Sequence, residues 1–402
     1  GCVVVMETKT GHIKAISNLG RADDGSYYET QNYAITESHE PGSTFKLMDL
    51  IAVLDDKKAD TGTVYNSFGG EIQYYGRRVR DSHKGGYGKI SLARGFEVSS
   101  NTVLVQSVYE SYKNNPKQFV DRINSYGLNK PLGLPIKGEG IPVIPQPGTN
   151  RWSGVSLPWM AFGYGLSVTP LQTLTLYNAV ANNGVMVKPI FVSEIKEWNK
   201  TIKKFDTQVI NPKICSQETL DKVHAVLENV VKKGTGSKLY SKDFSMAGKT
   251  GTAQVNYKDK SKLYYASSFV GYFPADEPKY SCIVVVHKPN VAAGYYGADV
   301  AGPVFKRIAQ KIFTDSPSMN HVKNIDAKVV SQEKNYSEYY KKVEKEERIV
   351  PNVKGMDGMD AVALLENLGL KVKVIGVGRV KKQSLTSGQA FNKNQTIIID
   401  LP

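Results

Sequence analysis

Strand-like segments lie at both ends of the first 315 residues, and a long helical region lies between them. This order constrains the fold more than any other feature. Residues 3–17 contain the strand-like runs VVVME and HIKAIS on either side of a turn at Thr8–Gly11 and predict a β-hairpin. Because both ends supply strands, we expect an α+β fold in which this hairpin completes a C-terminal antiparallel sheet, with a helical insertion. The remaining parts of that layer are predicted strands within 244–255, 266–273 and 281–289 and a closing helix over 298–313.

The middle of the chain has the apolar spacing of helices. One continuous helical pattern covers 91–112, and a second helix is opened by Thr169-Pro170 and closed by Asn182–Gly184. An amphipathic helix has a predicted capping-box start at Ser216, with Glu218 close by. We expect these helices to form a subdomain beside the sheet.

Ser43 and Lys46 are the first candidate functional residues. They lie three positions apart in HEPGSTFK, residues 39–46, where an apolar run with helical spacing begins. Residues three apart on a helix are roughly 5–6 Å apart, so the amine can reach the hydroxyl. A lysine accepts a serine proton only as the neutral amine, which requires burial or a second cation to lower its pKa from about 10.4 towards 7. We therefore predict Ser43 as the nucleophile and Lys46 as its base.

Two further short patterns follow Ser43 in the sequence. Ser99-Ser100-Asn101 lies at the start of an apolar helical run, and Lys249-Thr250-Gly251 lies within a strand-like run. Taken together with Ser43, they place one pattern at a helix start, one on the helical subdomain and one on a strand, as three walls of a cleft. Each pattern alone is weak, because similar letters recur at 193–196, 331–334, 318–320 and 9–11 in ordinary surface contexts.

Composition excludes several other functions. The chain has 402 residues, 52 Lys and Arg against 38 Asp and Glu, and a net charge of +14, but the lysines are scattered among acids, so no nucleic-acid partner is predicted. Cys2, Cys215 and Cys282 are an odd number, and no disulfide is predicted. The spacing of Cys and His gives no metal site, and no cofactor is predicted. A phosphate-binding loop at Gly248-Lys249-Thr250 fails because its first glycine would fall at Asp243.

The character of the chain changes after residue 315. Residues 316–347 are polar and of mixed charge, and predict a linker or a solvated helix. Residues 348–402 contain a helix and three short strands and predict a second compact unit. No apolar run of about 18 residues and no signal pattern occurs. The chain opens inside a strand, so we interpret it as a fragment whose N-terminal part was left out.

The sequence resembles the transpeptidase domain of class B penicillin-binding proteins. The motifs are EPGSTFK at 40–46, SSN at 99–101 and GKTGTAQ at 248–254, supported by GYGLSVTPLQ, SFVGYFPAD and YYGADVAGPVFKRI. The resemblance covers about residues 1–313 and implies a penicillin-binding transpeptidase fold, an antiparallel sheet flanked by helices plus an all-helical subdomain. We assign residues 1–315 to this domain.

The resemblance also implies roles for individual residues. Ser43 would attack a D-alanine carbonyl of a peptidoglycan stem peptide and form an acyl-enzyme, with Lys46 as the base. Ser99 would relay a proton to the leaving amine, and Asn101 would hold Lys46 and a substrate amide. Substrate binding would fall to the strand: Lys249 and Thr250 would bind the substrate carboxylate, and Thr250, Gly251 and Thr252 would line the subsite. Backbone N–H groups of Ser43 and Thr252 would form the oxyanion hole.

Residues 349–402 resemble a PASTA domain, a small α/β unit, and a role as spacer, docking surface or muropeptide-binding module stays open. A transpeptidase with this unit resembles the septal, cell-division type. The implied partners are stem peptides, β-lactam antibiotics, a membrane glycosyltransferase and division proteins. The implied location is the bacterial inner membrane, with a single span before this region and the region itself in the periplasm.

Three related activities compete with transpeptidation. A class A β-lactamase uses a similar serine, lysine and K-T-G set but needs a glutamate to activate water, and no E-x-x-L-N-like segment lies between Asn101 and Lys249. A D,D-carboxypeptidase uses the same residues and accepts water instead of an amine. A β-lactam sensor domain would be acylated and stay acylated.

Overall fold

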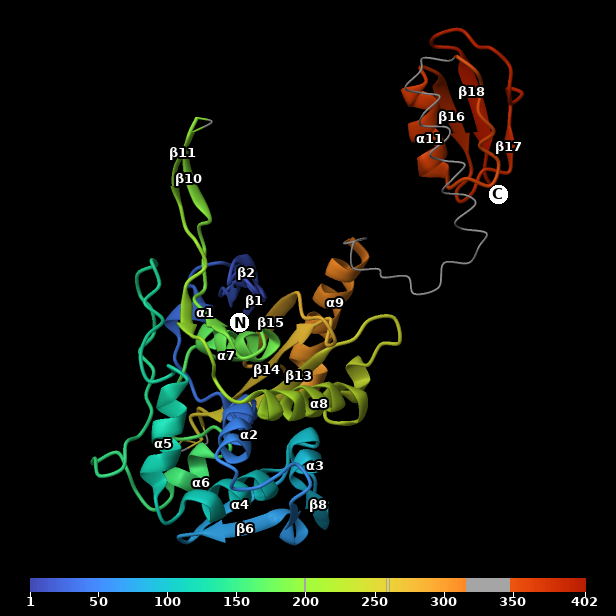
Figure 1. Cartoon of the computed structure of the whole chain (residues 1–402). Helices are drawn as coiled ribbons and strands as arrows, with labels where there is room; N and C mark the ends of the chain where they lie inside the picture. The colour runs from blue at the N-terminus through green and yellow to red at the C-terminus, as the bar shows by residue number, and fades with distance from the viewer. Residues whose placement is uncertain (199, 258, 260, 316–347) are drawn as a thin grey trace. The chain divides into compact units, whose positions relative to one another are not determined.

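The computed structural model describes residues 1–198, 200–257, 259, 261–315 and 348–402 (Figure 1). The chain divides into two compact units on either side of residue 317, and each is described by itself. The predicted linker, 316–347, lies outside the described residues, and the domain boundaries of 1–315 and 348–402 stay predictions.

A five-stranded antiparallel sheet forms the centre of the first unit. Its strand order is β13-β14-β15-β1-β2. The N-terminal hairpin, β1-β2, therefore pairs with β15, the last of the C-terminal strands, as predicted from the sequence. Val4 lies opposite Ile283 in this pairing, and both side chains are buried. The strands span β1 Cys2–Glu7, β2 Ile13–Asn18, β13 Ala247–Val255, β14 Tyr264–Phe273 and β15 Tyr280–His287.

Helices cover both faces of this sheet (Figure 1). One face packs against α9, Gly297–Asp315, where the Phe269 and Phe305 rings lie 4.7 Å apart between their centroids. The other face packs against α7, Pro170–Ala181, in which every residue is buried. The complete capping box predicted at Ser216 occurs at the start of α7 instead, between Thr169 and Gln172. Ser216 caps α8, Gln217–Lys233, by accepting a hydrogen bond from the Thr219 backbone alone.

The helical subdomain follows the first hairpin. Its helices are α2 Lys46–Asp55, α3 Leu92–Glu97, α4 Asn101–Tyr112, α5 Pro116–Ser125 and α6 Ser156–Met160. The prediction of one continuous helix over 91–112 is wrong, because the chain breaks between α3 and α4. Ser99 adopts a φ of 58° at the break, which a helix does not tolerate. The two helices then pack closely at Gly95, where a Cβ would lie 2.4 Å from Val103 Cγ1.

Short elements connect these parts. The 3₁₀ turns are η1 Gly42–Thr44, η2 Phe68–Gly70 and η3 Ser237–Leu239, and the first helix is α1 Tyr33–Thr36. The small strands are β3 Gly20–Arg21, β4 Tyr27–Tyr28, β5 Val64–Asn66, β6 Glu71–Tyr74, β7 Arg77–Arg80, β8 Lys89–Ser91, β9 Met186–Val187, β10 Glu194–Glu197, β11 Lys200–Lys204 and β12 Val209–Asn211.

The second unit contains one helix and a three-stranded sheet. The helix is α11, Gly358–Asn367, and Asp357 caps it by accepting a hydrogen bond from the Met359 backbone. The strand order is β16-β18-β17, with β16 parallel and β17 antiparallel to β18. Their bounds are β16 Lys371–Ile375, β17 Lys382–Gln383 and β18 Thr396–Asp400. The core consists of apolar residues from α11, β18 and the flanking loops.

Asn178 of α7 ties this helix to the sheet. Its Nδ2 donates to the Thr8 carbonyl at 3.0 Å, and its Oδ1 accepts from Ser281 Oγ at 2.7 Å, all in the buried core. We expect Asn178→Leu to lower the free energy of unfolding by about 2–3 kcal/mol, because it leaves two buried polar groups unpaired. Urea denaturation followed by circular dichroism measures the change. The exposed control Asn114→Leu should change the stability by less than about 0.5 kcal/mol, and equal effects of both substitutions would contradict the prediction.

Candidate active site

Ser43 lies in the 3₁₀ turn η1, three residues before α2 begins at Lys46. The prediction of a helix start is therefore correct in place, although the serine precedes the α-helix proper. The Tyr177 hydroxyl of α7 donates a hydrogen bond to the Thr44 carbonyl at 2.9 Å, which fixes the turn against α7. The Ser43 side chain is half-buried and makes no hydrogen bond to the described residues.

Glycines allow the Ser43 turn to lie directly against β13. A Cβ on Gly251 would lie 2.8 Å from Thr44 Cγ2 and 2.2 Å from Ser268 Oγ. Gly42 has a φ of 56°, and a Cβ added there would meet Ala253 Cβ at 3.2 Å. A side chain at Gly251 would have to displace the Thr44 and Ser268 side chains, and the positive φ of Gly42 favours glycine there. The strand and the turn are thereby held at a fixed separation.

Lys46 points to the break between α3 and α4. Its Nζ donates to the Ser99 carbonyl at 2.8 Å, to Ser99 Oγ at 3.2 Å and to Asn101 Oδ1 at 2.6 Å. The positive φ of Ser99 turns both its carbonyl and its hydroxyl towards the lysine. The Lys46 side chain has no exposed surface.

The orientation of Asn101 is fixed from its other end. Its Nδ2 donates to the Arg80 carbonyl at 2.6 Å, at the end of the β6–β7 hairpin, so Oδ1 is the atom that faces Lys46. The neighbouring Asp81 accepts hydrogen bonds from Ser100 Oγ at 3.0 Å and from the Thr102 backbone at 2.9 Å. The hairpin therefore holds the first turn of α4 in place.

Lys249, on strand β13, contacts Ser99 from the sheet. Its Nζ donates to Ser99 Oγ at 2.8 Å and to the Thr250 carbonyl at 3.0 Å, and it lies 5.7 Å from the centre of the Phe96 ring. Because both amines contact one hydroxyl, the Lys46 and Lys249 nitrogens are no more than about 6 Å apart. The structure thus brings together Lys46, Ser99, Asn101 and Lys249, which are far apart in the sequence.

The buried position of the two lysines changes their protonation. Burial lowers the pKa of Lys46 to about 7, against the opposing effects of Asp81 and Asp49. Burial, and then the charge of Lys46, holds the pKa of Lys249 well below its usual value. Two ammonium groups this close disfavour each other, so one amine becomes available as a base near neutral pH.

The remaining predicted site residues lie along β13. Thr250 Oγ1 is 2.7 Å from Thr235 Oγ1, and Thr252 Oγ1 accepts from the Gly297 backbone at 3.0 Å. The Gln254 N–H donates to the Tyr164 hydroxyl at 2.9 Å, away from the sheet. N–H groups of alternate strand residues point to the same side, so the Thr252 N–H also points to the free edge of β13.

Sequence reasoning missed several residues that shape this site. Asp81 and Arg80 orient the first turn of α4, Phe96 lies beside Lys249, and Tyr164 closes the free edge of β13 at Gln254. Arg80, Asp81 and Tyr164 lie in or beside Gly- and Tyr-rich segments, and Phe96 lies in α3 with no letter pattern that marks it. Asp49, one turn after Lys46, is fully buried and was also missed, and burial raises its pKa well above its usual value.

Family models match both units of the chain. A model of the penicillin-binding protein transpeptidase domain matches residues 1–310, and a PASTA domain model matches residues 348–401. The chain belongs to the penicillin-binding protein transpeptidase family. The predicted fold class is thereby confirmed, including the PASTA domain at the C-terminal end.

Curated relatives are similar over much of this chain. Stage V sporulation protein D of Bacillus subtilis is 29% identical over 99% of this chain and 60% of its own length. Peptidoglycan D,D-transpeptidase FtsI of Escherichia coli K12 is 29% identical over 77% of this chain and 50% of its own length. The chain therefore spans about half to three fifths of these relatives.

Solved structures agree with the fold. Penicillin-binding protein 3 from Mycobacterium tuberculosis, complexed with aztreonam, has a TM-score of 0.67 and 26% identity, covering 78% of this chain and 72% of the other. The same protein complexed with ampicillin has a TM-score of 0.66 and 27% identity, with the same coverage of both chains.

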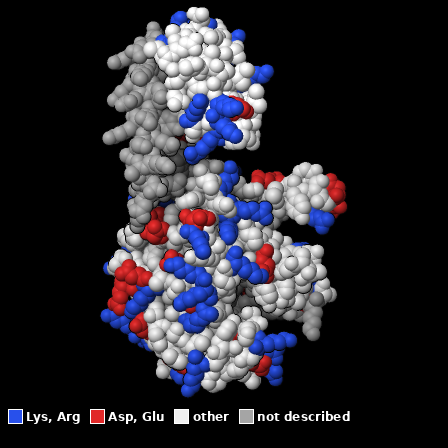
Figure 2. All heavy atoms as spheres, turned by 90° about the vertical axis from the view of Figure 1, so that its right-hand side faces the viewer, with Lys and Arg blue, Asp and Glu red and all other residues white. Residues whose placement is uncertain are grey.

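The surface and the helices add two observations. On the face drawn in Figure 2, Lys and Arg occur in several groups, with Asp and Glu among them. In the part of the chain that the structure describes, no helix has the length and apolar composition needed to cross a membrane.

A base with a pKa of about 7 predicts a pH-dependent reaction of Ser43 with a fluorescent penicillin. The neutral amine is the active form, so the second-order acylation rate should rise about tenfold per pH unit below 7 and level off above it. Stopped-flow or gel-based acylation between pH 5.5 and 9 measures this rate. Lys46→Arg, which stays charged, should lose the reaction throughout that range, and a rate independent of pH would contradict the assignment.

Proposed function

We propose that this chain is a serine-type peptidoglycan D,D-transpeptidase that cross-links stem peptides through an acyl-enzyme on Ser43. The observation that carries the proposal is the convergence of Lys46 and Lys249 on Ser99 Oγ, with Asn101 fixed beside them. The names of the FtsI relatives and the β-lactam complexes of a structural relative support it.

The acylation step follows from the geometry of the site. Lys46, as the neutral amine, takes the proton from Ser43 while Oγ attacks the carbonyl of the penultimate D-alanine. The tetrahedral oxyanion accepts hydrogen bonds from the Ser43 and Thr252 N–H groups, and each donor of this kind contributes about 10²–10³ in rate. The carbon–nitrogen bond then breaks, and the leaving D-alanine amine takes up a proton. The Ser99 hydroxyl, which can donate and accept, connects that amine to Lys46.

The deacylation step reverses these roles. An amine from a second stem peptide attacks the ester carbonyl and gives up a proton, and Ser43 regains one as its bond to the carbonyl breaks. Lys249 and Thr250 bind the donor carboxylate during acylation, with Gly251 and Thr252 lining the same strand edge. A β-lactam reacts at the same serine, but its leaving nitrogen stays attached to the acyl group.

The names of the FtsI relatives and the second unit support a cellular role in division. We place the activity in septal wall synthesis during division, outside the cytoplasmic membrane, beside a membrane glycosyltransferase and division proteins. The PASTA domain acts there as a spacer, docking surface or muropeptide-binding module. A sporulation role is the second candidate, because the match to stage V sporulation protein D extends over 99% of this chain, whereas the match to FtsI covers 77%.

Acylation of wild type and Ser43→Ala by a fluorescent penicillin tests the nucleophile. We expect one stable adduct on wild type and none on Ser43→Ala, measured by intact mass over several hours. Rapid loss of the adduct would identify a β-lactamase, and no adduct on folded wild type would sink the assignment of Ser43.

Product analysis with a D-Ala-D-Ala donor separates the remaining alternatives. A transpeptidase forms a new peptide bond to an added amine acceptor, whereas a carboxypeptidase releases only the shortened peptide. A sensor domain would form neither product from the D-Ala-D-Ala donor. Ser99→Ala should lower donor turnover by about 10²–10⁴, the usual contribution of a positioned acid or base, and the matched control Ser153→Ala on an exposed loop should leave turnover unchanged.

A further inference from the structure

Asp49 is a fully buried carboxyl group that the mechanism above does not use. It lies on α2 one helical turn after Lys46, and neither side chain has exposed surface. Neither carboxyl oxygen of Asp49 has a hydrogen-bond partner among the described residues. A buried carboxyl group without hydrogen bonds is costly and uncommon, which makes Asp49 a candidate for a functional role.

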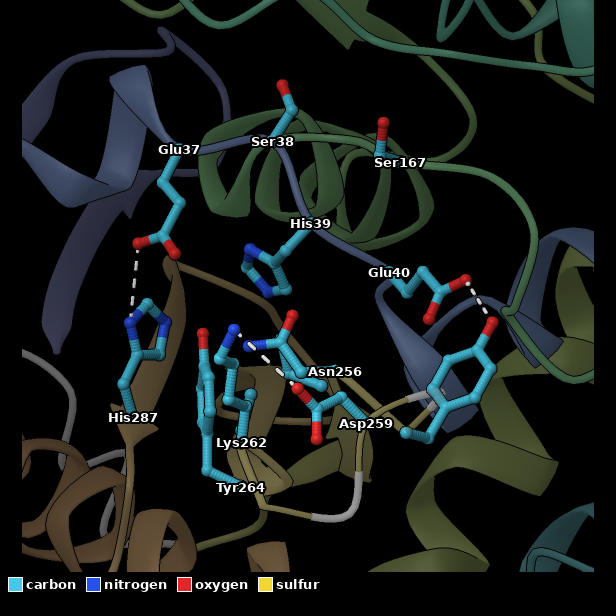
Figure 3. Close-up of a pocket in the computed structure, with 13 residues that line it drawn as sticks. Glu37, Ser38, His39, Glu40, Ser167, Asn256, Asp259, Lys262, Tyr264 and His287 are labelled. Atoms are coloured by element: carbon cyan, nitrogen blue, oxygen red, sulfur yellow. Dashed lines mark hydrogen bonds and ion pairs between the residues drawn. The ribbon is translucent and has the colours of Figure 1, made fainter.

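Other carboxylates near the nucleophile differ from Asp49 because they have partners. Three of them line the cavity beside residues 37–40, and their partners are His287 for Glu37, Tyr257 for Glu40 and Lys262 for Asp259 (Figure 3). At the C-terminal end of α2, Asp55 and Asp56 both face Arg122 of α5. Compared with these groups, Asp49 is placed in the core without a hydrogen bond to the described residues.

The charge that acts on Asp49 is that of Lys46. Residues three apart on a helix lie on one face, roughly 5–6 Å apart between their Cβ atoms. The Lys46 amine is turned towards Ser99 and Asn101, so the two groups interact through their charges. Burial has the largest effect on each pKa, lowering that of Lys46 to about 7 and raising that of Asp49 well above its usual value. Against burial, the charge of Asp49 raises the pKa of Lys46, and the charge of Lys46 lowers that of Asp49.

Two phenols also lie near Asp49, but neither is bonded to it. Burial, and with a smaller effect the charge of Asp49, raises the pKa values of Tyr177 on α7 and Tyr112 on α4. The Tyr177 hydroxyl donates to the Thr44 carbonyl, and the Tyr112 hydroxyl donates to Asp56. Both donors are thus directed to other acceptors, and the phenols do not supply the hydrogen bonds that the carboxyl group lacks.

Three further charges approach α2. Asp81, after the end of β7, raises the pKa of Lys46, whereas Lys249 is a second buried amine whose charge opposes an ammonium at Lys46. Lys222 of α8 is paired with Asp60, beyond the C-terminal end of α2. An ammonium at Lys46 is therefore stabilised by the carboxylates of Asp81 and Asp49 and destabilised by Lys249.

Lys46 and Asp49 titrate as a pair. Burial moves their pKa values towards each other, and the ionised form of each group stabilises the ionised form of the other. Protons then leave in two steps that belong to the pair and not to either residue alone. The form with a neutral Lys46 and an ionised Asp49 is the one that remains at alkaline pH.

We propose that Asp49 is a positioning residue that sets the basicity of Lys46 through its charge. The proposal rests on the proposed function, in which Lys46 takes the proton of Ser43. That transfer forms an ammonium close to Lys249, and a carboxylate one turn away stabilises it. The Ser43 proton moves to Lys46 in this step, and Asp49 exchanges no proton. Asp49 thereby makes Lys46 a stronger base and raises the pH at which Lys46 becomes neutral.

The pH dependence of acylation by a fluorescent penicillin tests this role in Asp49→Asn, which removes the charge and keeps the shape. The midpoint of the acid limb should move down by about one pH unit, the lower end of the effect of a close opposite charge. The plateau rate should fall about threefold, because a weaker base takes the proton more slowly. The variant should therefore react about two- to threefold faster than wild type at pH 5.5 and about threefold slower at pH 9.

This crossing of the two profiles separates an effect of charge from an effect on structure. Asp49→Thr removes the charge with a different shape and should cross the wild-type profile in the same way. The exposed control Asp121→Asn, on the surface of α5, should follow wild type at every pH. If neither Asp49 variant crosses the wild-type profile, the proposal is overturned.

A measurement without substrate keeps this result apart from the proposed function. NMR titration of isotope-labelled lysine side chains follows the protonation of Lys46 directly, with its signal assigned by Lys46→Arg. The pKa of Lys46 should be about one unit lower in Asp49→Asn than in wild type. An unchanged pKa would overturn the role of Asp49 even where the penicillin reaction proceeds. A lowered pKa in a protein that reacts with no penicillin would support the coupling of Asp49 to Lys46 and overturn only the proposed function.

Discussion

Two buried lysines that share one serine hydroxyl are the constraint on which the first unit depends. Lys46 comes from α2, Ser99 from the break between α3 and α4, and Lys249 from β13. Neither amine has exposed surface, so each must find its hydrogen-bond acceptors inside the protein. Both amines reach the shared acceptor, Ser99 Oγ, only when β13, α2 and the break between α3 and α4 are in their native positions. The active site therefore forms only when these three parts pack correctly against one another.

Close approaches between backbone segments hold these parts in position. Gly251 leaves room for the Ser43 turn, and Gly163 leaves room for the Gly42 carbonyl, which a Cβ would meet at 2.0 Å. Tyr177 then supports the turn through the Thr44 carbonyl from the fully buried α7. These contacts connect β13, the loop after α6 and α7 to the turn that carries Ser43, so small displacements of α7 or β13 change the position of Ser43. Fixed geometry of this kind is what an activated nucleophile requires.

The sequence predicted the parts of this site but not their connections. Strand and helix periods located β13 and α4, because those patterns are local, and the hairpin pairing followed from the order of elements. The left-handed Ser99 was not predicted, because apolar residues with helical spacing continue on both sides of the break. In the structure Ser100 caps α4 by accepting a hydrogen bond from the Val103 N–H, and Gly95 packs against Val103. The orientation of the Asn101 side chain depends on its hydrogen bond to the Arg80 carbonyl. The two residues are 21 positions apart, and a contact to a backbone carbonyl produces no sequence motif. The three short motifs were informative because their order and context agreed with the resemblance to the family.

The burial that makes Lys46 reactive also costs stability. Its pKa falls from 10.5 to about 7 on folding, a difference worth about 5 kcal/mol between the protonation states. The unfolded chain binds more protons between about pH 7 and 10, so this contribution to the free energy of unfolding becomes more favourable as pH rises through that window and is at its least favourable below pH 7. Lys249 acts in the same direction. The apolar core around α2 and α7 offsets this cost, and the buried α7 is therefore as much a requirement of the chemistry as the residues that contact the substrate.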